Sequence, residues 1–195
     1  TLKETERAIK MIKDFFELNL AAELKLRRVT APLFVQRGTG INDDLNGTER
    51  PVSFEVKDME GTTAEIVHSL AKWKRMMLAD YEIANNYGLY TDMNALRPDE
   101  ELDNIHSIYV DQWDWELAIS PEQRNLDFLT SVIEKIWSVI KGAEIFILDR
   151  FPTLRDDRYP RLPEKLTFIH AEDILERYPD LPRKERETRL LQDYP

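Results

Sequence analysis

A segment near the middle of the chain alternates as a strand does, yet it carries polar side chains on both faces. Its sequence is Asp111-Gln112-Trp113-Asp114-Trp115. On a strand Gln112 and Asp114 share one face, while the two tryptophans share the other face with Asp111. A buried carboxylate is unfavourable unless it is paired or hydrogen-bonded. A solvent-facing edge strand is one explanation, but the tryptophans favour a ligand site in which Asp114 receives an ammonium group.

A second candidate segment, Val67–Arg75, concentrates the cations Lys72, Lys74 and Arg75 where a strand is expected to lead into a helix. A basic, solvated helix face explains this run on spacing alone. The N-terminus of a helix with a lysine beside it also suits an anion, because backbone N–H groups and the helix dipole favour negative charge. Spacing alone leaves both interpretations open.

Arg97 ends a predicted strand just before the acidic turn Pro98–Glu101. A surface ion pair with Asp99 or Glu101 is one interpretation, and such a pair contributes only ~0–1 kcal/mol. The other is a guanidinium that binds a phosphate, for which its planar fork is suited.

Two further carboxylates, Asp43 and Asp44, lie in residues 38–47, a stretch dense in turn-forming residues. A segment of this composition is expected to form a loop. On spacing alone, both aspartates are explained as turn residues.

Several classes of chemistry are excluded by what the sequence lacks. It has no cysteine, which excludes disulfide scaffolds, thiolate zinc sites and cysteine nucleophiles. A hydrolase triad is disfavoured, because the histidines, His68, His106 and His170, lie far apart in the sequence and no serine stands in a nucleophile-elbow context. The six glycines form neither common phosphate-binding loop, so a nucleotide would have to be bound in another way.

The composition is that of a globular protein, with 195 residues, 42% hydrophobic and 33% charged. The net charge of −10 makes a nucleic acid an unlikely partner but leaves a single anionic ligand possible. We expect no membrane partner, because no apolar run approaches the ~20 residues of a membrane span. The polar N-terminal residues also lack the features of a signal peptide.

Hydrophobic periodicity predicts helices and strands that together make an α+β fold, with helices packed against antiparallel strands. The strands at 52–57 and 65–68 form a hairpin, and strict alternation predicts that the first of them is half-buried. The expected helices cover residues 3–24, 70–81, a long segment starting at 126, 171–177 and 183–192, and the expected strands cover 26–37, 52–57, 65–68, 90–96, 105–115 and 166–169.

Four motifs in the same order resemble the ammonia-dependent asparagine synthetases, which are aspartate–ammonia ligases of the bacterial A type. The resemblance covers nearly the whole chain, from the first helix to Arg177–Leu181. The motifs are His68-Ser69-Leu70-Ala71-Lys72-Trp73-Lys74-Arg75, Gly88-Leu89-Tyr90-Thr91, Ala95-Leu96-Arg97-Pro98-Asp99-Glu100 and His106-Ser107-Ile108-Tyr109-Val110-Asp111-Gln112-Trp113-Asp114-Trp115-Glu116.

The resemblance implies a fold like the catalytic domain of class II aminoacyl-tRNA synthetases, an antiparallel sheet flanked by helices. It further implies a single such domain over residues 1–195 and a cytoplasmic homodimer. The first helix and the strand around Pro32 would build the dimer interface.

The resemblance also implies a reaction. The side-chain carboxylate of L-aspartate attacks the α-phosphate of ATP in the presence of Mg²⁺, and pyrophosphate leaves. Ammonia then displaces AMP from the β-aspartyl-adenylate to give L-asparagine. No covalent enzyme intermediate is required, which agrees with the absence of a nucleophile motif.

The matching motif positions carry over candidate roles. Arg97 corresponds to the arginine that binds the α-phosphate, and Lys74 corresponds to the lysine near the reacting carboxylate; both are candidate catalytic and ATP-binding residues. No metal ligand is assigned. The candidate substrate-binding residues, which would contact the amino acid or the ammonium ion, are Asp43, Ser69, Gln112 and Asp114.

The chain departs from the family in two respects. Asn85–Gly88 replaces a small, glycine-containing acidic stretch that would border the nucleotide pocket. Family members also continue well beyond this C-terminus with further strands and binding residues. We therefore expect the N-terminal part of a catalytic domain, and we expect that the chain alone is not a competent ligase.

Two other functions are compatible with parts of the sequence. The first is an asparaginyl- or aspartyl-tRNA synthetase domain, which the net charge, the missing anticodon-binding domain and the run Trp113–Glu116 disfavour. The second is a non-catalytic sensor of amino acids or adenylates. The early C-terminus favours a sensor, whereas the phosphate-binding cations Lys74 and Arg97 disfavour it.

Overall fold

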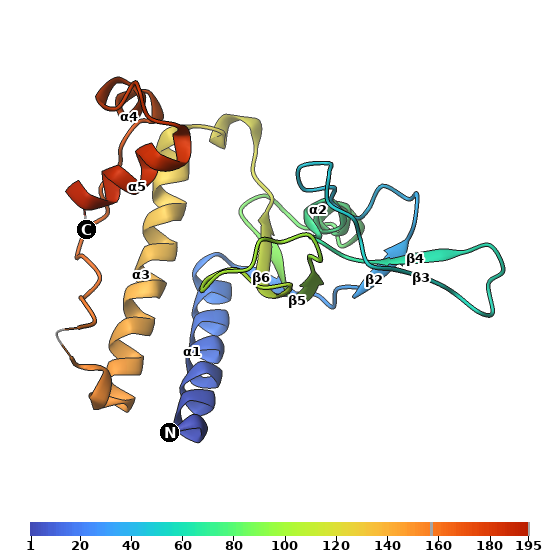
Figure 1. Cartoon of the computed structure of the whole chain (residues 1–195), viewed down its shortest axis with the longest axis horizontal. Helices are drawn as coiled ribbons and strands as arrows, with labels where there is room; N and C mark the ends of the chain where they lie inside the picture. The colour runs from blue at the N-terminus through green and yellow to red at the C-terminus, as the bar shows by residue number, and fades with distance from the viewer. Residues whose placement is uncertain (157, 195) are drawn as a thin grey trace. The chain divides into compact units, whose positions relative to one another are not determined.

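The structure is a computed structural model that describes residues 1–156 and 158–194 (Figure 1). The chain divides into two compact units, Thr1–Arg155 and Asp156–Pro195, and each is described by itself. A single domain over the whole chain remains a prediction. None of the described helices is long and apolar enough to cross a membrane.

The two long helices of the first unit, α1 and α3, begin at well-formed caps. Thr1 and Glu4 make a capping box at the start of α1, in which the Glu4 N–H donates to Thr1 Oγ1 at 3.3 Å. Asn125 caps α3 by accepting a hydrogen bond from the Phe128 N–H at 2.9 Å. The elements are α1 (Leu2–Glu23), α2 (Ala71–Asp80), α3 (Leu126–Arg150) and two short 3₁₀ helices, η1 (Pro121–Gln123) and η2 (Pro152–Leu154).

The first sheet has the order β1-β5-β6, with β1 parallel and β6 antiparallel to the central strand β5. Its strands are β1 (Leu26–Arg28), β5 (Gly88–Leu96) and β6 (Tyr109–Leu117). The strand predicted at 105–115 therefore starts too early. The Asp103 carboxylate accepts hydrogen bonds from the Ile105 and His106 N–H groups, both at 2.8 Å, and so turns this segment before β6 begins.

The second sheet is antiparallel in the order β2-β4-β3, which confirms the hairpin. Its strands are β2 (Phe34–Gln36), β3 (Ser53–Glu55) and β4 (Thr63–Ile66). The predicted strand at 26–37 divides at Pro32, so that β1 and β2 belong to different sheets. The prediction that the strand at 52–57 is half-buried holds only at its ends, where Val52 and Val56 are half-buried, and fails for β3 itself, in which every residue is exposed. It is an edge strand, and Phe54 packs edge-on against Phe34 at a ring-centroid distance of 5.3 Å.

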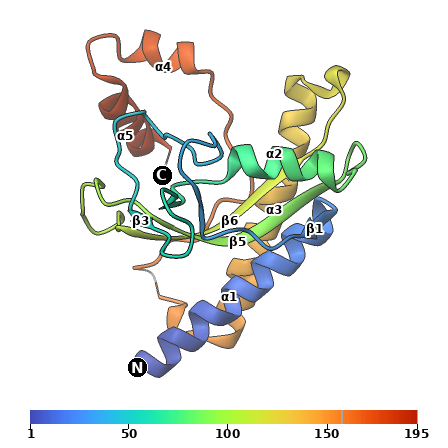
Figure 2. The same cartoon turned by 90° about the vertical axis from the view of Figure 1, so that its right-hand side faces the viewer.

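The first sheet is covered on both faces (Figure 2). On one face, α1 and α3 pack against it and against each other, with the rings of Phe15 and Phe146 stacked at 4.7 Å. On the other face lies α2, where Leu70 and Val67 join Met93 and Ala95 of β5 in a buried cluster. This second face carries the chemistry-bearing side chains.

The second unit contains α4 (Ala171–Arg177) and α5 (Arg183–Asp193), both close to their predicted bounds. A hydrogen bond of 2.5 Å from Tyr178 Oη to Asp193 Oδ2 links the two helical segments. The predicted strand at 166–169 is wrong, since the chain there has no regular structure. In the part of this unit that the structure describes there is no strand to pair with it, and an unpaired strand leaves its backbone without partners.

Candidate active site

Gln112 and Asp114 share one face of β6, as the strand alternation predicts, and α2 lies over this face. Asp114 stands opposite Thr91 in the β5–β6 ladder, and Gln112 stands opposite Met93. Both of these β5 residues are buried. Trp113 lies on the opposite face, where its ring stacks on Phe16 of α1 at 5.0 Å.

Lys74 of α2 is the centre of the site. Its side chain is only 1% exposed, and its ammonium group forms an ion pair with Asp114 Oδ1. The same nitrogen lies 3.5 Å from Glu116 Oε1 and 3.5 Å from the carbonyl oxygen of Trp115. A charge this deeply buried requires such partners. The α2 stripe of cations is therefore more than a solvated face, because one of its three members is inside the protein.

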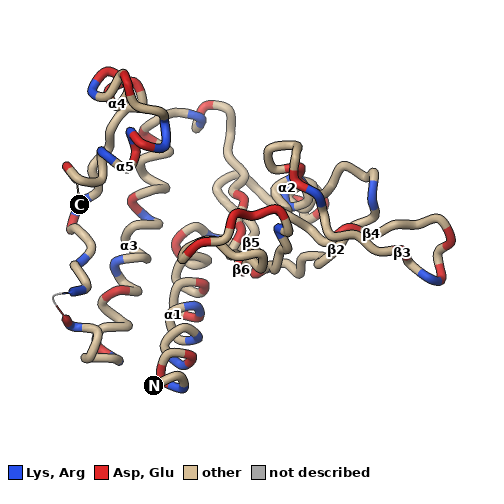
Figure 3. Tube along the Cα trace, viewed as in Figure 1, with Lys and Arg blue, Asp and Glu red and all other residues tan. Residues whose placement is uncertain are grey.

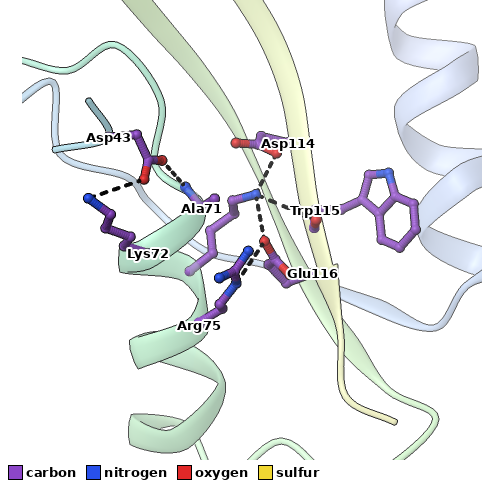
Figure 4. Close-up of polar contacts among 8 residues, drawn as sticks. Asp43, Ala71, Lys72, Arg75, Asp114, Trp115 and Glu116 are labelled. Atoms are coloured by element: carbon purple, nitrogen blue, oxygen red, sulfur yellow. Dashed lines mark hydrogen bonds and ion pairs between the residues drawn. The ribbon is translucent and has the colours of Figure 1, made fainter. Parts of the chain in front are cut away.

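Glu116 is a site residue that the sequence analysis missed. It shares the face of Asp114 because it follows two residues later on β6, and it contacts two cations of α2. Arg75 Nε lies 3.9 Å from Glu116 Oε1, in addition to the contact with Lys74 (Figure 4). Continuing the alternation by one more step along the strand would have found it.

Asp43 lies at the N-terminus of α2 (Figure 4). Its Oδ2 accepts a hydrogen bond of 3.0 Å from the Ala71 N–H, and its Oδ1 lies 3.8 Å from Lys72 Nζ. The N-cap residue Leu70 has no side-chain cap of its own, so the loop carboxylate supplies it. The anion at this helix N-terminus is thus Asp43 itself, which is more than a turn residue.

Asn42 is a second residue that the sequence analysis missed. It is buried, its Oδ1 accepts a hydrogen bond of 2.9 Å from the His68 N–H, and its Nδ2 donates to the Ile66 carbonyl at 3.4 Å. It thereby attaches the loop to the segment that leads into α2. No local signal distinguishes it from the other turn-forming residues around it.

Arg97 follows directly after β5, and its guanidinium reaches the segment that leads into α2. Its Nη2 lies 3.5 Å from the carbonyl oxygen of His68, whereas its Nε is buried and has no partner among the described residues. The interpretation that Arg97 pairs with Asp99 is wrong, since the Asp99 carboxylate binds Arg50. An arginine with an unused, buried donor is suited to a phosphate oxygen.

Besides Trp137 Nε1 in α3, two more buried polar atoms lack partners within the described chain, His68 Nε2 and Thr91 Oγ1. Both side chains are almost completely buried, at 1% and 0% exposure. They belong to the segments that carry the site, since Thr91 faces Asp114 and His68 precedes α2. Unsatisfied buried groups of this kind are expected where a polar ligand completes the hydrogen bonding.

The predicted site residues are brought together to different degrees. Lys74 and Asp114 are in direct contact. Asp43 caps α2, the helix that carries Lys74, and Arg97 contacts the carbonyl of His68 just before that helix. Ser69 and Gln112 are half-buried on the same segments, but neither makes a side-chain hydrogen bond within the described residues. No cluster of three or more His, Asp or Glu side chains that could hold a metal is found in residues 1–156 and 158–194.

The replaced stretch before β5 contacts the end of η1. Asn86 Oδ1 accepts a hydrogen bond of 2.5 Å from Gln123 Nε2, and the Asn86 N–H donates to the Ala118 carbonyl at 2.7 Å. These contacts fix the stretch against the end of β6. Its expected position at a nucleotide pocket remains a prediction.

Comparison with known proteins agrees with this set of residues. The sequence profile of one family, described as aspartate-ammonia ligase, matches residues 3–195. The chain belongs to that family. The resemblance inferred from the four motifs is therefore confirmed.

Curated relatives carry the same description. A protein from Parabacteroides distasonis, called aspartate–ammonia ligase, is 55% identical over 193 residues, which are 99% of this chain and 55% of that protein. A Clostridium perfringens protein of that name is 55% identical over 194 residues, 100% of this chain and 56% of its own length. One from Fusobacterium nucleatum is 55% identical over 191 residues, 98% of this chain and 57% of its length. The chain thus spans little more than half the length of these relatives.

Proposed function

We propose that this chain contributes the substrate site of an ATP-dependent ligase that joins L-aspartate and ammonia into L-asparagine. The observation that carries the proposal is the buried Lys74, paired with Asp114 on the sheet face that leads to Arg97. This arrangement combines groups for an ammonium ion, a carboxylate and a phosphate. Membership of the family supports the same reaction.

Arg97 binds the α-phosphate of ATP in this proposal. Its unpartnered Nε supports the role, because a phosphate oxygen would satisfy a donor that the protein leaves free. The attack on phosphorus builds negative charge on the phosphate oxygens, and a fixed guanidinium stabilises that charge.

Lys74 lies beside the reacting carboxylate of aspartate. Its buried position supports the role, since the protein orients the ammonium group through Asp114 and Glu116 before any substrate binds. A charge fixed in advance requires little reorganisation when the transition state forms. Lys74 thereby lowers the barrier to attack and assists ATP binding.

The four substrate-binding residues complete the proposal. Asp43 and Asp114 provide two carboxylates for two ammonium-type groups, the α-ammonium of aspartate and the incoming ammonia. The side chains of Gln112 and Ser69 remain available for hydrogen bonds to the amino acid. Their positions on β6 and before α2 place them on the elements that carry the carboxylates.

The proposed reaction proceeds in two displacements. A side-chain oxygen of aspartate attacks the α-phosphorus, pyrophosphate leaves, and a β-aspartyl-adenylate forms. Nitrogen of ammonia then attacks the acyl carbon, a proton is lost, and AMP leaves. Mg²⁺, when bound, would neutralise phosphate charge in the first displacement. None of this chain's residues is assigned as its ligand.

The remaining parts of the proposal concern the whole protein. It is a cytoplasmic homodimer with a fold like the class II synthetase catalytic domain, and it acts on small molecules without binding nucleic acid or membrane. The helices and antiparallel strand pairs of the first unit are consistent with that fold.

Calorimetric binding of ATP and of L-aspartate to the 195-residue chain tests the proposal. Arg97→Ala should weaken ATP binding about 10- to 100-fold, the loss expected for about 1.5–3 kcal/mol of charged hydrogen bonding. Asp114→Asn should weaken aspartate binding, and the exposed control Arg7→Ala should change neither. Wild-type affinity for ATP in Arg97→Ala would refute the assigned role.

A second assay separates a ligase from a sensor. Aspartate-dependent exchange of pyrophosphate into ATP, in the protein at its natural length and with Mg²⁺, requires the adenylate to form. Binding of both ligands without such exchange would identify a sensor instead. Exchange that is lost in Lys74→Met and retained in Lys135→Met would support the ligase.

A further inference from the structure

Residues 42–50 form a loop that connects two parts of the candidate site. At its start, Asn42 and Asp43 are hydrogen-bonded to the segment that leads into α2. At its end, Arg50 binds Asp99 in the turn that follows β5. The loop therefore runs from the carboxylate of Asp43 to the immediate neighbourhood of Arg97.

The contact at the end of the loop is unusually complete for a surface ion pair. The backbone N–H of Arg50 donates to Asp99 Oδ2 at 2.8 Å, Nη2 donates to Oδ1 at 2.5 Å, and Nε lies 3.1 Å from Oδ1. The carboxylate thus receives one backbone and two side-chain donors from a single residue. These bonds lower the pKa of Asp99 to about 2, so the contact persists at neutral and mildly acidic pH.

The loop forms one wall of a hollow of about 370 Å³. The opposite wall comes from the turn after β5. The lining residues are Leu45, Asn46, Glu49, Arg97, Asp99 and Glu100. Arg97 is the cation among these lining residues. Arg50 does not line the hollow, but it binds Asp99, which does.

The loop is itself stiff enough to act as a wall. Glu49 accepts hydrogen bonds from the backbone N–H and Nδ2 of Asn46, at 3.0 and 2.9 Å. The Gly47 N–H donates to the Asp44 carbonyl at 2.6 Å. A tight turn with these internal bonds moves as a unit about its two attachments. Breaking one attachment therefore releases the whole wall.

We propose that Arg50 and Asp99 form a clasp that holds the 42–50 loop over Arg97, so that the proposed phosphate site is enclosed before its ligand binds. Both are positioning residues, and they act through the loop and through Arg97. The inference deepens the proposed function and rests on it. Exposed ion pairs contribute little to global stability, so the clasp acts on the position of the loop and hardly on unfolding.

The expected effect on binding follows from the population of the closed loop. The apparent dissociation constant equals the intrinsic one divided by the fraction of molecules that are competent to bind. If loss of the clasp reduces the closed fraction to about a fifth or a tenth, ATP binding weakens about five- to tenfold. The chemistry after closure is unchanged, so the effect falls on KM for ATP and leaves kcat nearly the same.

Hydrogen exchange of the 195-residue chain, combined with ATP binding, tests the clasp. In Arg50→Gln, the amides of residues 44–50 should exchange at least tenfold faster, and the dissociation constant for ATP should rise five- to tenfold. Arg50→Lys keeps the charge without the planar fork and should give intermediate values. The matched control is Arg37→Gln, which breaks another exposed arginine–carboxylate pair, with Glu65 at 2.7 Å, at the edge of the second sheet. It should change neither quantity.

Three results would overturn the inference. Unchanged loop exchange in Arg50→Gln would show that the pair does not hold the loop. Faster exchange with unchanged ATP affinity would show that the loop does not enclose the phosphate site. A fall in thermal stability that accounts for the whole change in exchange would show a merely structural role. If the wild-type chain binds no ATP, the proposed function fails, whereas loop exchange still decides whether the clasp exists.

Discussion

At the scale of single residues, the site is organised around one charge that is placed inside the protein. Lys74 is 1% exposed and lies between Asp114 and Glu116, whose side chains are 26% and 23% exposed. The strand β6 can place two carboxylates on a covered face because the lysine compensates for them. The lysine, in turn, can be buried because the strand supplies them. Removing the lysine, or removing the carboxylates, leaves the other charge without a partner.

Lys74→Met should therefore destabilise the fold. Removing one partner of a buried ion pair typically lowers the free energy of unfolding by about 3–5 kcal/mol, because the remaining charges stay buried. Urea denaturation measures the loss. Lys72→Met is the matched control, since Lys72 is 43% exposed and its pairs with Asp43 and Asp44 are longer than 3.5 Å; we expect less than ~1 kcal/mol for it. Equal effects in the two variants would contradict the central role of Lys74.

The carboxyl group of Asp99 should titrate far below its ordinary range. The side chain and backbone of Arg50 lower its pKa from 3.8 to about 2. Because the pKa is depressed in the folded state, its stabilising contribution is present above the ordinary pKa and is lost as the pH falls through about 2. Carboxyl-carbon NMR should find the group ionised at pH 3, and Arg50→Gln should return the pKa toward 3.8. A midpoint near 3.8 in the wild type would disprove the contact.

The sequence could predict those residues whose neighbours in the chain reveal them. Asp114 and Gln112 stand out as polar residues beside the two tryptophans of their strand, and Lys74 lies in a dense run of cations. Asp43 was found only through the resemblance to the family, because its contact with Ala71 joins residues that are far apart in the sequence. Asn42 could not be predicted for the same reason, since its partners His68 and Ile66 come from another element.

At the scale of elements, the site depends on how a loop is attached to a helix. Asn42 accepts the His68 N–H and so fixes the residue before Asp43, which in turn caps α2. Asn42→Ala leaves a buried N–H without its acceptor, which should lower the free energy of unfolding by about 1–3 kcal/mol. Chemical denaturation measures this, with the exposed Asn104→Ala as the control. An effect of the same size in both variants would show that the Asn42 contact contributes nothing particular.

The start of β5 requires a glycine for steric reasons. A Cβ atom on Gly88 would lie 2.2 Å from the Glu116 carbonyl oxygen and 2.7 Å from Leu26 Cδ2. Gly88→Ala should therefore separate β5 from β6 or β1 and lower the free energy of unfolding by about 1–3 kcal/mol or more. It should also disturb the ion pair of Glu116 with Lys74.

The matched control for this variant is Gly142→Ala in α3. A Cβ there would meet Phe15 Cζ at 3.4 Å, an ordinary contact, and alanine favours a helix over glycine by about 1 kcal/mol. Thermal melts should show a lower midpoint for Gly88→Ala and an equal or higher one for Gly142→Ala. A neutral Gly88→Ala would mean that the strand ladder can shift without loss.

Hydrophobic periodicity predicted an element well where the same face of that element is buried along its length. The helices α1, α2 and α3 each bury one stripe, and their predicted positions agree with the structure. Alternation failed for β3, because the same pattern arises whether or not another layer covers the strand. It also failed at 166–169, where apolar residues suggest a strand but a strand needs a neighbour that local sequence does not reveal.

At the scale of the whole molecule, charge has to be reconciled with assembly. The net charge of −10 makes two copies repel each other, so association requires an apolar surface or complementary pairs. Charges of both signs alternate along α1, whereas acidic residues gather in the turn between β5 and β6 (Figure 3). All candidate site residues lie in Thr1–Arg155, so any partner that completes the site must reach this unit.

A group of exposed apolar side chains on the second sheet is suited to the proposed homodimer. Leu33, Phe34 and Phe54 are 52%, 50% and 42% exposed, close to Pro32, which the family resemblance places at the interface. Burial of such rings stabilises association by roughly 25 cal/mol for each Å² of apolar surface removed from water. We therefore expect Phe34→Asp to shift the sedimenting species from a dimer to a monomer of 23.0 kDa.

Sedimentation velocity at tens of micromolar protein measures this shift, and circular dichroism checks that the variant remains folded. Leu102→Asp is the matched control, because Leu102 is 62% exposed in the acidic turn and belongs to no strand of the second sheet, so its substitution should leave the dimer intact. A dimer that persists in Phe34→Asp would move the interface to another surface. A monomeric wild type would contradict the homodimer and would require that the site be completed within one chain.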